Sequence, residues 1–249
     1  MAFPPAAMPS EPPGQPGLVR RYLERALPHG AEPVRQVRVE QTGRMFRGAG
    51  SRPMRFTAVE HFAVDRVAFS WEARFPIIAI APRISLRVTD GYTDGRGALI
   101  VRALGVPVQV QRGREVTVGE AYRYLAELPW APHAMLANAE LDWREVDTST
   151  VEVATAAGGE RATVRFEFDS RGDIIRCRAP SRPRADHPTV RGMPWGGEFR
   201  DYRTIDGVRL PARAEVYWEE PEGRFVYWEG EILAVRGLGE DFTAPRGIA

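Results

Sequence analysis

The ionisable side chains that could carry out catalysis are scattered along the chain. The single cysteine is Cys177, and the histidines are His29, His61, His133 and His187. None of them has the spacing of a metal site, so we predict no bound metal. The absence of a G-x-S-x-G elbow argues against a hydrolase of that design, and we predict no cofactor. His61 is a candidate acid or base, because it lies in the middle of an expected strand next to Glu60.

A second set of candidates lies near the C-terminus, on two expected strands in which side chains alternate between the faces. The residues that share a face are Arg213, Glu215 and Tyr217 on one strand and Tyr227, Glu229 and Glu231 on the next. Cross-strand ion pairs facing solvent are one interpretation. If this face lines a cavity instead, Glu215 or Glu229 is a candidate acid or base, and Arg213 could hold an oxyanion or a polar headgroup.

The basic residues exclude several classes of enzyme. All 34 are arginine, so the chain has no lysine for a Schiff base, for pyridoxal phosphate or for a nucleotide-binding phosphate loop. Against 33 acidic residues they leave a net charge of +1, which does not favour nucleic acid as a partner. The basic stretch 176–191 is expected to be a loop, which could hold a carboxylate or a phosphate or simply face solvent.

The length of 249 residues and the 43% hydrophobic content allow one large β-rich domain. Residues 1–16 contain six prolines and are expected to be a disordered tail, residues 17–240 the domain, and residues 241–249 a C-terminal tail. No signal peptide or long apolar segment is visible, which predicts a cytoplasmic protein without membrane insertion. Its oligomeric state is left open.

The hydrophobic periodicity predicts a mainly β (α+β) fold. An amphipathic helix over 18–27 ends at Pro28, and strands of period two follow, such as 68–75 and the closing meander with its Asp206-Gly207 hairpin. A helix begins near Thr117, where Thr117 and Glu120 have the spacing of a capping box, and stops at Pro129; Pro132 begins a further turn. About ten antiparallel strands must curl into a barrel or split into a sandwich. We expect a curved sheet forming a half-open barrel, with an N-terminal helix and a central helical lid.

Aromatic side chains supply the expected ligand site. Such side chains at strand positions are usually core packing, but an apolar site needs aromatic groups on both the wall and the lid. The candidate ligand-binding residues are Trp71, Phe75, Tyr124, Trp130, Trp143, Trp195, Arg213 and Tyr217.

Several stretches resemble a known family. R-Y-L-A-E-L-P-W-A-P-H-A-M-L (123–136), F-S-W-E-A-R (69–74), D-G-Y-T-D-G-R-G (90–97) and the block 194–218 are similar to a bacterial family of domains of unknown function, over residues 17–235. The closing block also resembles the D-Y-x-x-x-D-G-x-x-x-P hairpin of periplasmic lipoprotein carriers, whose half-barrel wraps a helical lid around acyl chains. Because no secretion signal is visible in this sequence, we expect the chain to differ from those carriers in its location.

Three functions are compatible with these observations. The first is binding of an apolar or amphipathic small molecule in a half-barrel cavity. The second is a cofactor-independent cyclase, isomerase or hydrolase of specialised metabolism, acting on a hydrophobic substrate through His61, Glu215 or Glu229. The third is a structural domain that binds a partner protein.

Overall fold

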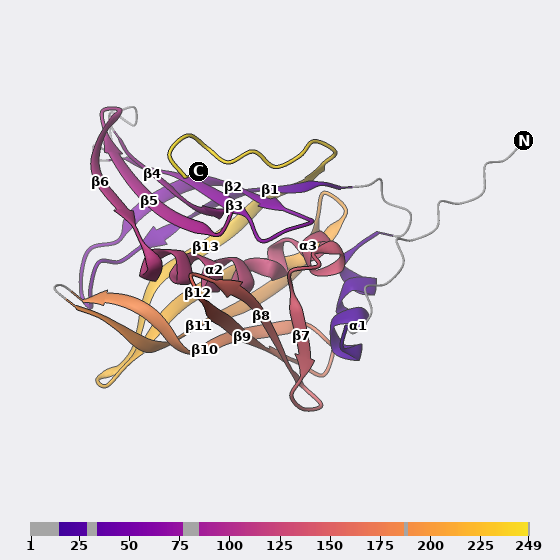
Figure 1. The fold of residues 1–249 in the computed structure, drawn as a ribbon. Coiled ribbons are helices and arrows are strands. Elements are labelled where there is room, and N and C mark those ends of the chain that lie inside the picture. The colour runs from indigo at the N-terminus through magenta and orange to yellow at the C-terminus, as the bar shows by residue number, and fades with distance from the viewer. Residues whose placement is uncertain (1–14, 29–33, 77–84, 187–188, 249) are drawn as a thin grey trace, which may run out of the picture.

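One continuous antiparallel sheet dominates the fold (Figure 1). The computed structural model describes residues 15–28, 34–76, 85–186 and 189–248. Within these residues, thirteen strands lie in the order β6-β5-β4-β3-β2-β1-β13-β12-β11-β10-β9-β8-β7. Strands that follow one another in sequence are neighbours in each half, and β1 lies beside β13. The sheet therefore consists of two meanders that are joined by the first and the last strand.

The strands and helices have the following bounds. The first meander contains β1 (Gln36–Met45), β2 (Met54–Ala63), β3 (Phe69–Pro76), β4 (Ser85–Thr93), β5 (Arg96–Ala103) and β6 (Val106–Arg112). The second contains β7 (Asp142–Glu145), β8 (Thr150–Ala157), β9 (Glu160–Phe168), β10 (Ile174–Asp186), β11 (Thr189–Ile205), β12 (Val208–Glu220) and β13 (Gly223–Leu238). The helices are α1 (Gly17–Ala26), α2 (Arg114–Glu127), the 3₁₀ turn η1 (Leu128–Trp130) and α3 (Pro132–Ala137).

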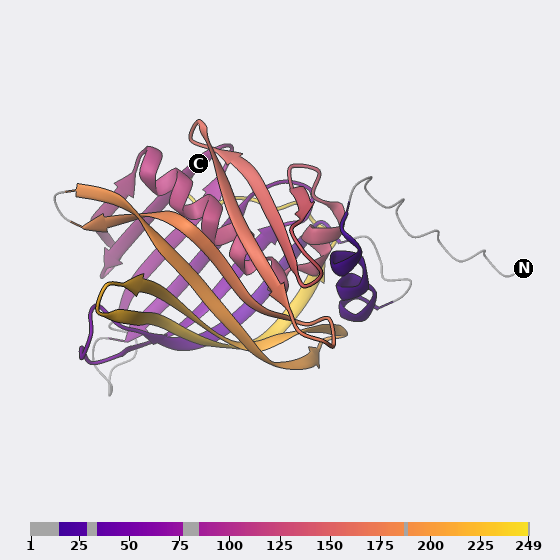
Figure 2. The ribbon, with the colours of Figure 1, turned by 90° about the horizontal axis from the view of Figure 1, so that it is seen from below.

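The central helical segment links the two edges of the sheet. In the chain, α2, η1 and α3 come between β6 and β7, which are the edge strands. The sheet curls so that α2 lies between the two meanders and contacts β5 on one side and β9 and β10 on the other (Figures 1 and 2). This arrangement confirms the predicted fold class, a curved antiparallel half-barrel with an N-terminal and a central helix.

Local signals in the sequence set several of the boundaries. Helix α1 ends at Ala26, two residues before Pro28, and Pro132 is the first residue of α3. Asp206 and Gly207 have φ angles of 48° and 86°, as a type I′ turn requires, and they connect β11 to β12. The hairpin predicted there is therefore confirmed.

Other local predictions are wrong. Helix α2 begins at Arg114, and Thr117 does not cap it, because its Oγ1 accepts a hydrogen bond from the Gly97 amide at 3.0 Å. Strand β6 is not predicted, because Pro107 interrupts the alternation of apolar and polar residues that indicates a strand. The stretch 176–191 is no loop, since most of it pairs as the β10–β11 hairpin.

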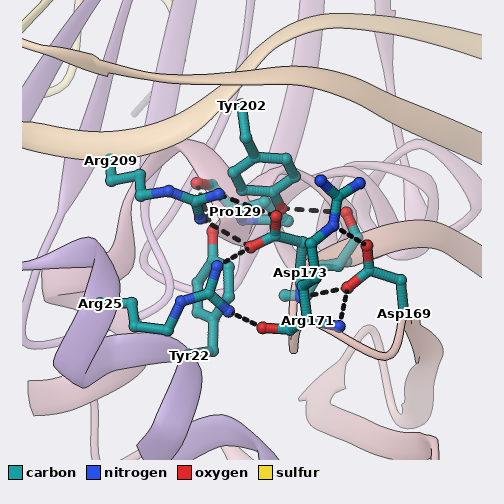
Figure 3. A network of polar contacts seen from close by, with 9 residues as sticks. Tyr22, Arg25, Pro129, Asp169, Arg171, Asp173, Tyr202 and Arg209 are labelled. Carbon is teal, nitrogen blue, oxygen red and sulfur yellow. Dashed lines mark hydrogen bonds and ion pairs between the residues drawn. The ribbon is translucent and has the colours of Figure 1, made fainter.

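Helix α1 is fixed to one end of the half-barrel through Asp173, at the start of β10 (Figure 3). The carboxylate of Asp173 accepts hydrogen bonds from Arg25 of α1 at 2.7 Å and from Arg209 of β12 at 2.6 and 2.8 Å. We call these three residues the Asp173 clasp. Beside it, the Tyr22 hydroxyl donates to the Pro129 carbonyl at 3.2 Å, which ties α1 to η1 as well.

The expected tails lie partly outside the described residues, which begin at Gln15. The Gln15 amide donates to the Met135 carbonyl at 2.5 Å. At the other end, Phe242 is buried against Ala63 and Ala68, and Ile248 is also buried, so residues 241–248 pack on the sheet. None of the helices in the described part of the chain has the length and apolar character to cross a membrane.

Candidate functional site

A buried ionic group lies between the concave face of the sheet and α2. Glu60 of β2 alternates with Phe56, Ala58 and Phe62 and therefore faces inward, without any exposed surface. The Arg123 guanidinium on α2 contacts Glu60 at 3.2 Å, Asp90 of β4 at 2.6 Å and Glu127 at 2.9 Å.

Glu120 is also on the inner side of α2, three residues before Arg123, and is buried. We call Glu60, Asp90, Glu120, Glu127 and Arg123 the interior cluster.

The interior cluster is continuous with aromatic side chains of the sheet. The Gln41 amide donates to Glu60 at 2.5 Å, and the Trp71 indole donates to Gln41 at 3.0 Å. The Arg123 guanidinium also lies over the Trp71 ring, 4.9 Å from its centroid, and over the Phe69 ring at 5.1 Å. Trp71 therefore borders both the charged and the apolar part of the interior.

The interior cluster has more carboxyl groups than cations. Burial raises the pKa of Glu60 well above its ordinary value, and the neighbouring Glu127 adds to this effect. The pKa of Glu120 is raised well above its ordinary value by burial and then by Asp90. Among the described residues, the second carboxyl oxygens of Asp90, Glu120 and Glu127 have no hydrogen-bond partner. The cluster can thus hold protons at a pH at which surface carboxyl groups are ionised.

An apolar layer of six aromatic side chains adjoins this cluster. We call it the aromatic layer; it consists of Phe56, Trp71, Phe75, Trp130, Phe199 and Trp228. Phe56 contacts Trp71, Phe75 and Trp228, with ring centroids 5.4 to 5.9 Å apart. Trp130 of η1 closes the layer against Trp228 at 5.8 Å and Phe199 at 6.0 Å. Sheet and helical segment thus meet through aromatic rings.

Arg182 of β10 lies at the other side of α2. The Arg182 guanidinium stacks on Trp195 at 4.4 Å and on Trp218 at 5.6 Å. It donates to the Gly119 carbonyl at 3.3 Å and to the Tyr227 hydroxyl at 3.2 Å. In the part of the chain that the structure describes, no carboxylate forms an ion pair with it, so this half-buried cation has only neutral direct partners.

Tyr227 reaches this inner position because of a β-bulge. Val216 pairs with Trp228 but Tyr217 pairs with Val226, which leaves Tyr227 as the extra residue of β13. Its ring stacks on Trp218, while Glu229, two positions further on, pairs with Arg44. The expectation that Tyr227 and Glu229 share a face is therefore wrong.

The structure brings together some of the residues that the sequence singled out for ligand binding. Trp71, Phe75 and Trp130 belong to the aromatic layer, and Trp195 stacks on Arg182. Tyr124 is buried in a separate group with Phe62 and Phe69, where Asn138 donates to its hydroxyl at 2.8 Å. Trp143 lies apart from these groups, on edge strand β7, and is half-buried.

The remaining predicted residues lie on the convex face. Glu215 pairs with Arg200 at 2.6 Å, and Glu229 with Arg44. Arg213 lies 3.6 Å from Glu231, and Tyr217 lies under Arg224 at 3.8 Å. His61 faces away from Glu60, and burial followed by the charge of Arg38 lowers its pKa. None of these five side chains lies in the interior cluster.

Sequence reasoning missed the interior cluster. The Asp90-Gly91 pair is typical of a turn, but Asp90 lies within β4, and only Asp94-Gly95 forms the turn to β5. Glu60 is one residue that could have indicated the cluster, because Ala58 and Phe62, two residues away on either side, are apolar and place the carboxylate on the buried face of the strand. A second signal is the spacing of Glu120, Arg123 and Glu127 along one helix. In the described residues, no group of three or more His, Cys, Asp or Glu side chains is placed to hold a metal ion.

Fold and interior together define an antiparallel half-barrel with a helix across its opening. The chain belongs to the family of unknown function DUF6544, which matches residues 6–230. The family membership expected from the sequence motifs is thus confirmed. No curated protein matches the chain.

Solved structures of similar shape were found at low sequence identity. A LolA superfamily protein from Nitrosomonas europaea is 10% identical, with a TM-score of 0.48 and coverage of 90% of this chain and 93% of that one. A putative outer membrane lipoprotein-sorting protein domain from Vibrio parahaemolyticus is 10% identical, with a TM-score of 0.45 and coverage of 89% and 91%. A DUF1329 family protein from Desulfovibrio piger is 12% identical, with a TM-score of 0.40 and coverage of 90% and 92%.

Proposed function

We propose that the half-barrel interior binds an apolar or amphipathic small molecule, with α2 and η1 as the lid. The observation that carries this proposal is the aromatic layer, in which a ring of η1 packs directly on rings of the sheet. A ligand would separate Trp130 from Trp228 and replace their contact with its own. Because apolar contacts are exchanged for apolar contacts, this opening costs little once the ligand is in place.

Half-buried apolar side chains mark the entrance. Met45 pairs with Met54 and with Trp228, and Leu86 pairs with Phe75, so these side chains extend the aromatic layer to the end of the strands. All three are partly exposed and pack against the core. Such a rim, apolar and open to water, favours entry of an apolar chain or ring at this end.

The polar end of an amphipathic ligand would lie near Arg182. A half-buried guanidinium without an ion-pair partner among the described residues favours an anionic group, such as a carboxylate. The Tyr227 hydroxyl beside it accepts hydrogen bonds from Arg182 and from the Trp195 indole, so its own proton is left to donate to such a group. A cytoplasmic location and the absence of nucleic-acid partners stay predictions of the sequence.

The rim provides the test of this function. Leu86→Arg places a charge at the entrance, and we expect the affinity for a neutral naphthylamine fluorescent probe to fall by roughly tenfold, about 1.4 kcal/mol. Leu233→Arg is the matched control, because Leu233 is 53% exposed on the convex face, and it should leave binding unchanged. Equal probe affinity in both variants and the wild type would show that the interior is not the binding site.

A second function, a cofactor-independent enzyme, is favoured by the raised pKa values of Glu60, which lies beside Trp71, and of Glu120. Small molecules that co-purify with the native protein can be identified by mass spectrometry and then incubated with it. Turnover that is lost in Glu120→Gln and kept in Glu145→Gln, a change of an exposed carboxylate, would favour the enzyme. A ligand that is bound and released without change would leave only the binding function.

A further inference from the structure

The convex face carries a groove of about 410 Å³ where β2, β1, β13, β12 and β11 lie side by side. We call it the outer groove. Its floor is formed by Gly43, Gly230 and Ala214, which are register neighbours on three adjacent strands. It lies on the opposite side of the sheet from the aromatic layer, so a ligand site in the outer groove is independent of the proposed function.

The packing of the interior explains why the floor has small residues. A Cβ atom at Gly43 would lie 2.7 Å from the Phe56 ring, and one at Gly230 would lie 2.2 Å from the Trp228 ring. The aromatic rings therefore take the space on the inner side of these glycines. The floor of the outer groove is consequently bare backbone, with the walls made by the side chains of the neighbouring residues.

Two pairs of arginines form the walls. Arg44 lies directly across from Arg55 on β1 and β2, and Arg213 lies directly across from Arg200 on β12 and β11. Like charges directly opposite each other in a sheet are destabilising unless an anion is close. The carboxylates Glu229 and Glu231 lie on β13, between the two arginine pairs, and provide part of the negative charge that these pairs need.

The carboxylates do not neutralise the groove. Arg55 forms no ion pair within the described residues, and Arg213 contacts Glu231 and Asp201 only at 3.6 and 3.5 Å. The lining residues are four guanidiniums and two carboxylates, an excess of two positive charges. Beyond the lining, Arg203 adds one positive charge, and Glu215 and Asp201 add two negative ones, so the surroundings remain positive.

We propose that the outer groove binds a phosphate monoester as its dianion. Guanidinium groups bind phosphate through paired N–H donors, and two arginine pairs on facing walls supply such donors from both sides. The lining alone has an excess of two positive charges, and one remains when Arg203, Glu215 and Asp201 are counted, so the outer groove favours an anion. The volume exceeds that of phosphate alone and leaves room for the group that the phosphate is attached to.

The proposal can be tested by calorimetric titration of the full chain with glycerol 3-phosphate at fixed low salt. We expect Arg55→Gln to weaken binding by roughly tenfold, because it removes charge-assisted hydrogen bonds. Arg55 is exposed and outside any ion pair of the described residues, so the variant should keep the wild-type melting temperature. Arg74→Gln is the matched control, because Arg74 is exposed and faces Arg87 across β3 and β4 but does not line the groove.

Vesicles of phosphatidylcholine with and without phosphatidic acid distinguish a lipid headgroup from a free monoester. Binding of the monoester that is weakened by Arg55→Gln and not by Arg74→Gln supports the proposal. If vesicles containing phosphatidic acid show the same pattern, the lipid phosphate is a further source of the ligand. Equal weakening by both variants would show general attraction to a basic face, and this result, or no binding of the monoester, would overturn the proposal.

Discussion

The Asp173 clasp and the interior cluster differ in the charge that is in excess: arginines outnumber carboxyl groups in the first, and carboxyl groups outnumber arginines in the second. In the Asp173 clasp one carboxylate accepts hydrogen bonds from two guanidiniums, whereas in the interior cluster one guanidinium pairs with three carboxyl groups and lies within electrostatic reach of a fourth, Glu120. Burial alone would raise the pKa of Asp173, but Arg209 and Arg25 outweigh it and hold the pKa below its ordinary value. In the interior cluster the pKa values of Glu60 and Glu120 are raised.

This difference separates a structural role from a chemical one. The Asp173 clasp is satisfied when all its members are charged, so it can hold α1 in place without taking part in any reaction. The interior cluster cannot be satisfied with all its carboxyl groups ionised, so it retains protons and leaves oxygens without partners. Perturbed carboxyl groups of the second kind are the ones found at functional sites. Three variants test this contrast.

The largest effect is expected for Arg123→Met, which leaves buried carboxyl groups without their cation. At pH 7 the free energy of unfolding should fall by about 3–5 kcal/mol, and at pH 5 by less, because the carboxyl groups can be protonated there. Urea unfolding at the two pH values measures this. Arg20→Met, at an exposed position of α1, is the control. An equal loss of free energy of unfolding at pH 7 and pH 5 would show that the carboxyl groups of the interior cluster do not depend on Arg123 for their charge.

A smaller effect is expected for Asp173→Asn, about 1–2 kcal/mol at pH 7, since Arg25 and Arg209 are 35% and 28% exposed and water screens them. Because the pKa of Asp173 is lowered in the folded state, its contribution is present above the unfolded pKa and disappears as the pH falls through the folded one. The free energies of unfolding of wild type and Asp173→Asn, measured by urea unfolding, should therefore become equal at acid pH. Asp201→Asn, which changes a 55% exposed carboxylate at a left-handed backbone position, should have almost no effect at either pH.

The smallest change in the free energy of unfolding at acid pH is expected for Glu120→Gln. Its dependence on pH should be opposite to that of Asp173→Asn. As the pH rises above the ordinary pKa of glutamate, the unfolded chain ionises while the folded protein keeps the proton on Glu120, so wild-type stability falls. The variant should be within about 0.5 kcal/mol of the wild type at pH 4 and gain on it up to pH 8. Urea unfolding across this pH range measures the difference, with Glu145→Gln as control. A constant difference in the free energy of unfolding between wild type and Glu120→Gln would show that Glu120 does not keep its proton in the folded protein.

Much of the fold could be predicted because its signals are local. Phe69, Trp71, Ala73 and Phe75 alternate as a half-buried strand must, and all four are buried in β3. The helix stop before Pro28 and the Asp206-Gly207 turn depend on residues next to each other in the sequence. The curl of the sheet could be predicted from strand number and twist alone.

The interior cluster could not be predicted in the same way. Glu60 and Asp90 lie on either side of Trp71 in the register of β2, β3 and β4, but Arg123 comes from α2, and the curl of the sheet brings this helix to them. The bulge in β13, opposite Val216 and Tyr217, moves Tyr227 to the other face, and a period of two along the strand contains no sign of it. Likewise, Thr117 looks like a helix cap until Gly97, twenty residues earlier, is seen to donate to it.

The seam between β1 and β13 has a consequence for synthesis on the ribosome. In the described residues each meander pairs strands that are close in sequence, so each can form while the nascent chain is still growing. The seam instead joins residues such as Val39 and Val235, nearly two hundred positions apart. Until β13 emerges, β1 keeps an unpaired edge that other chains could bind, and completion of the domain must wait until β13 has left the ribosome.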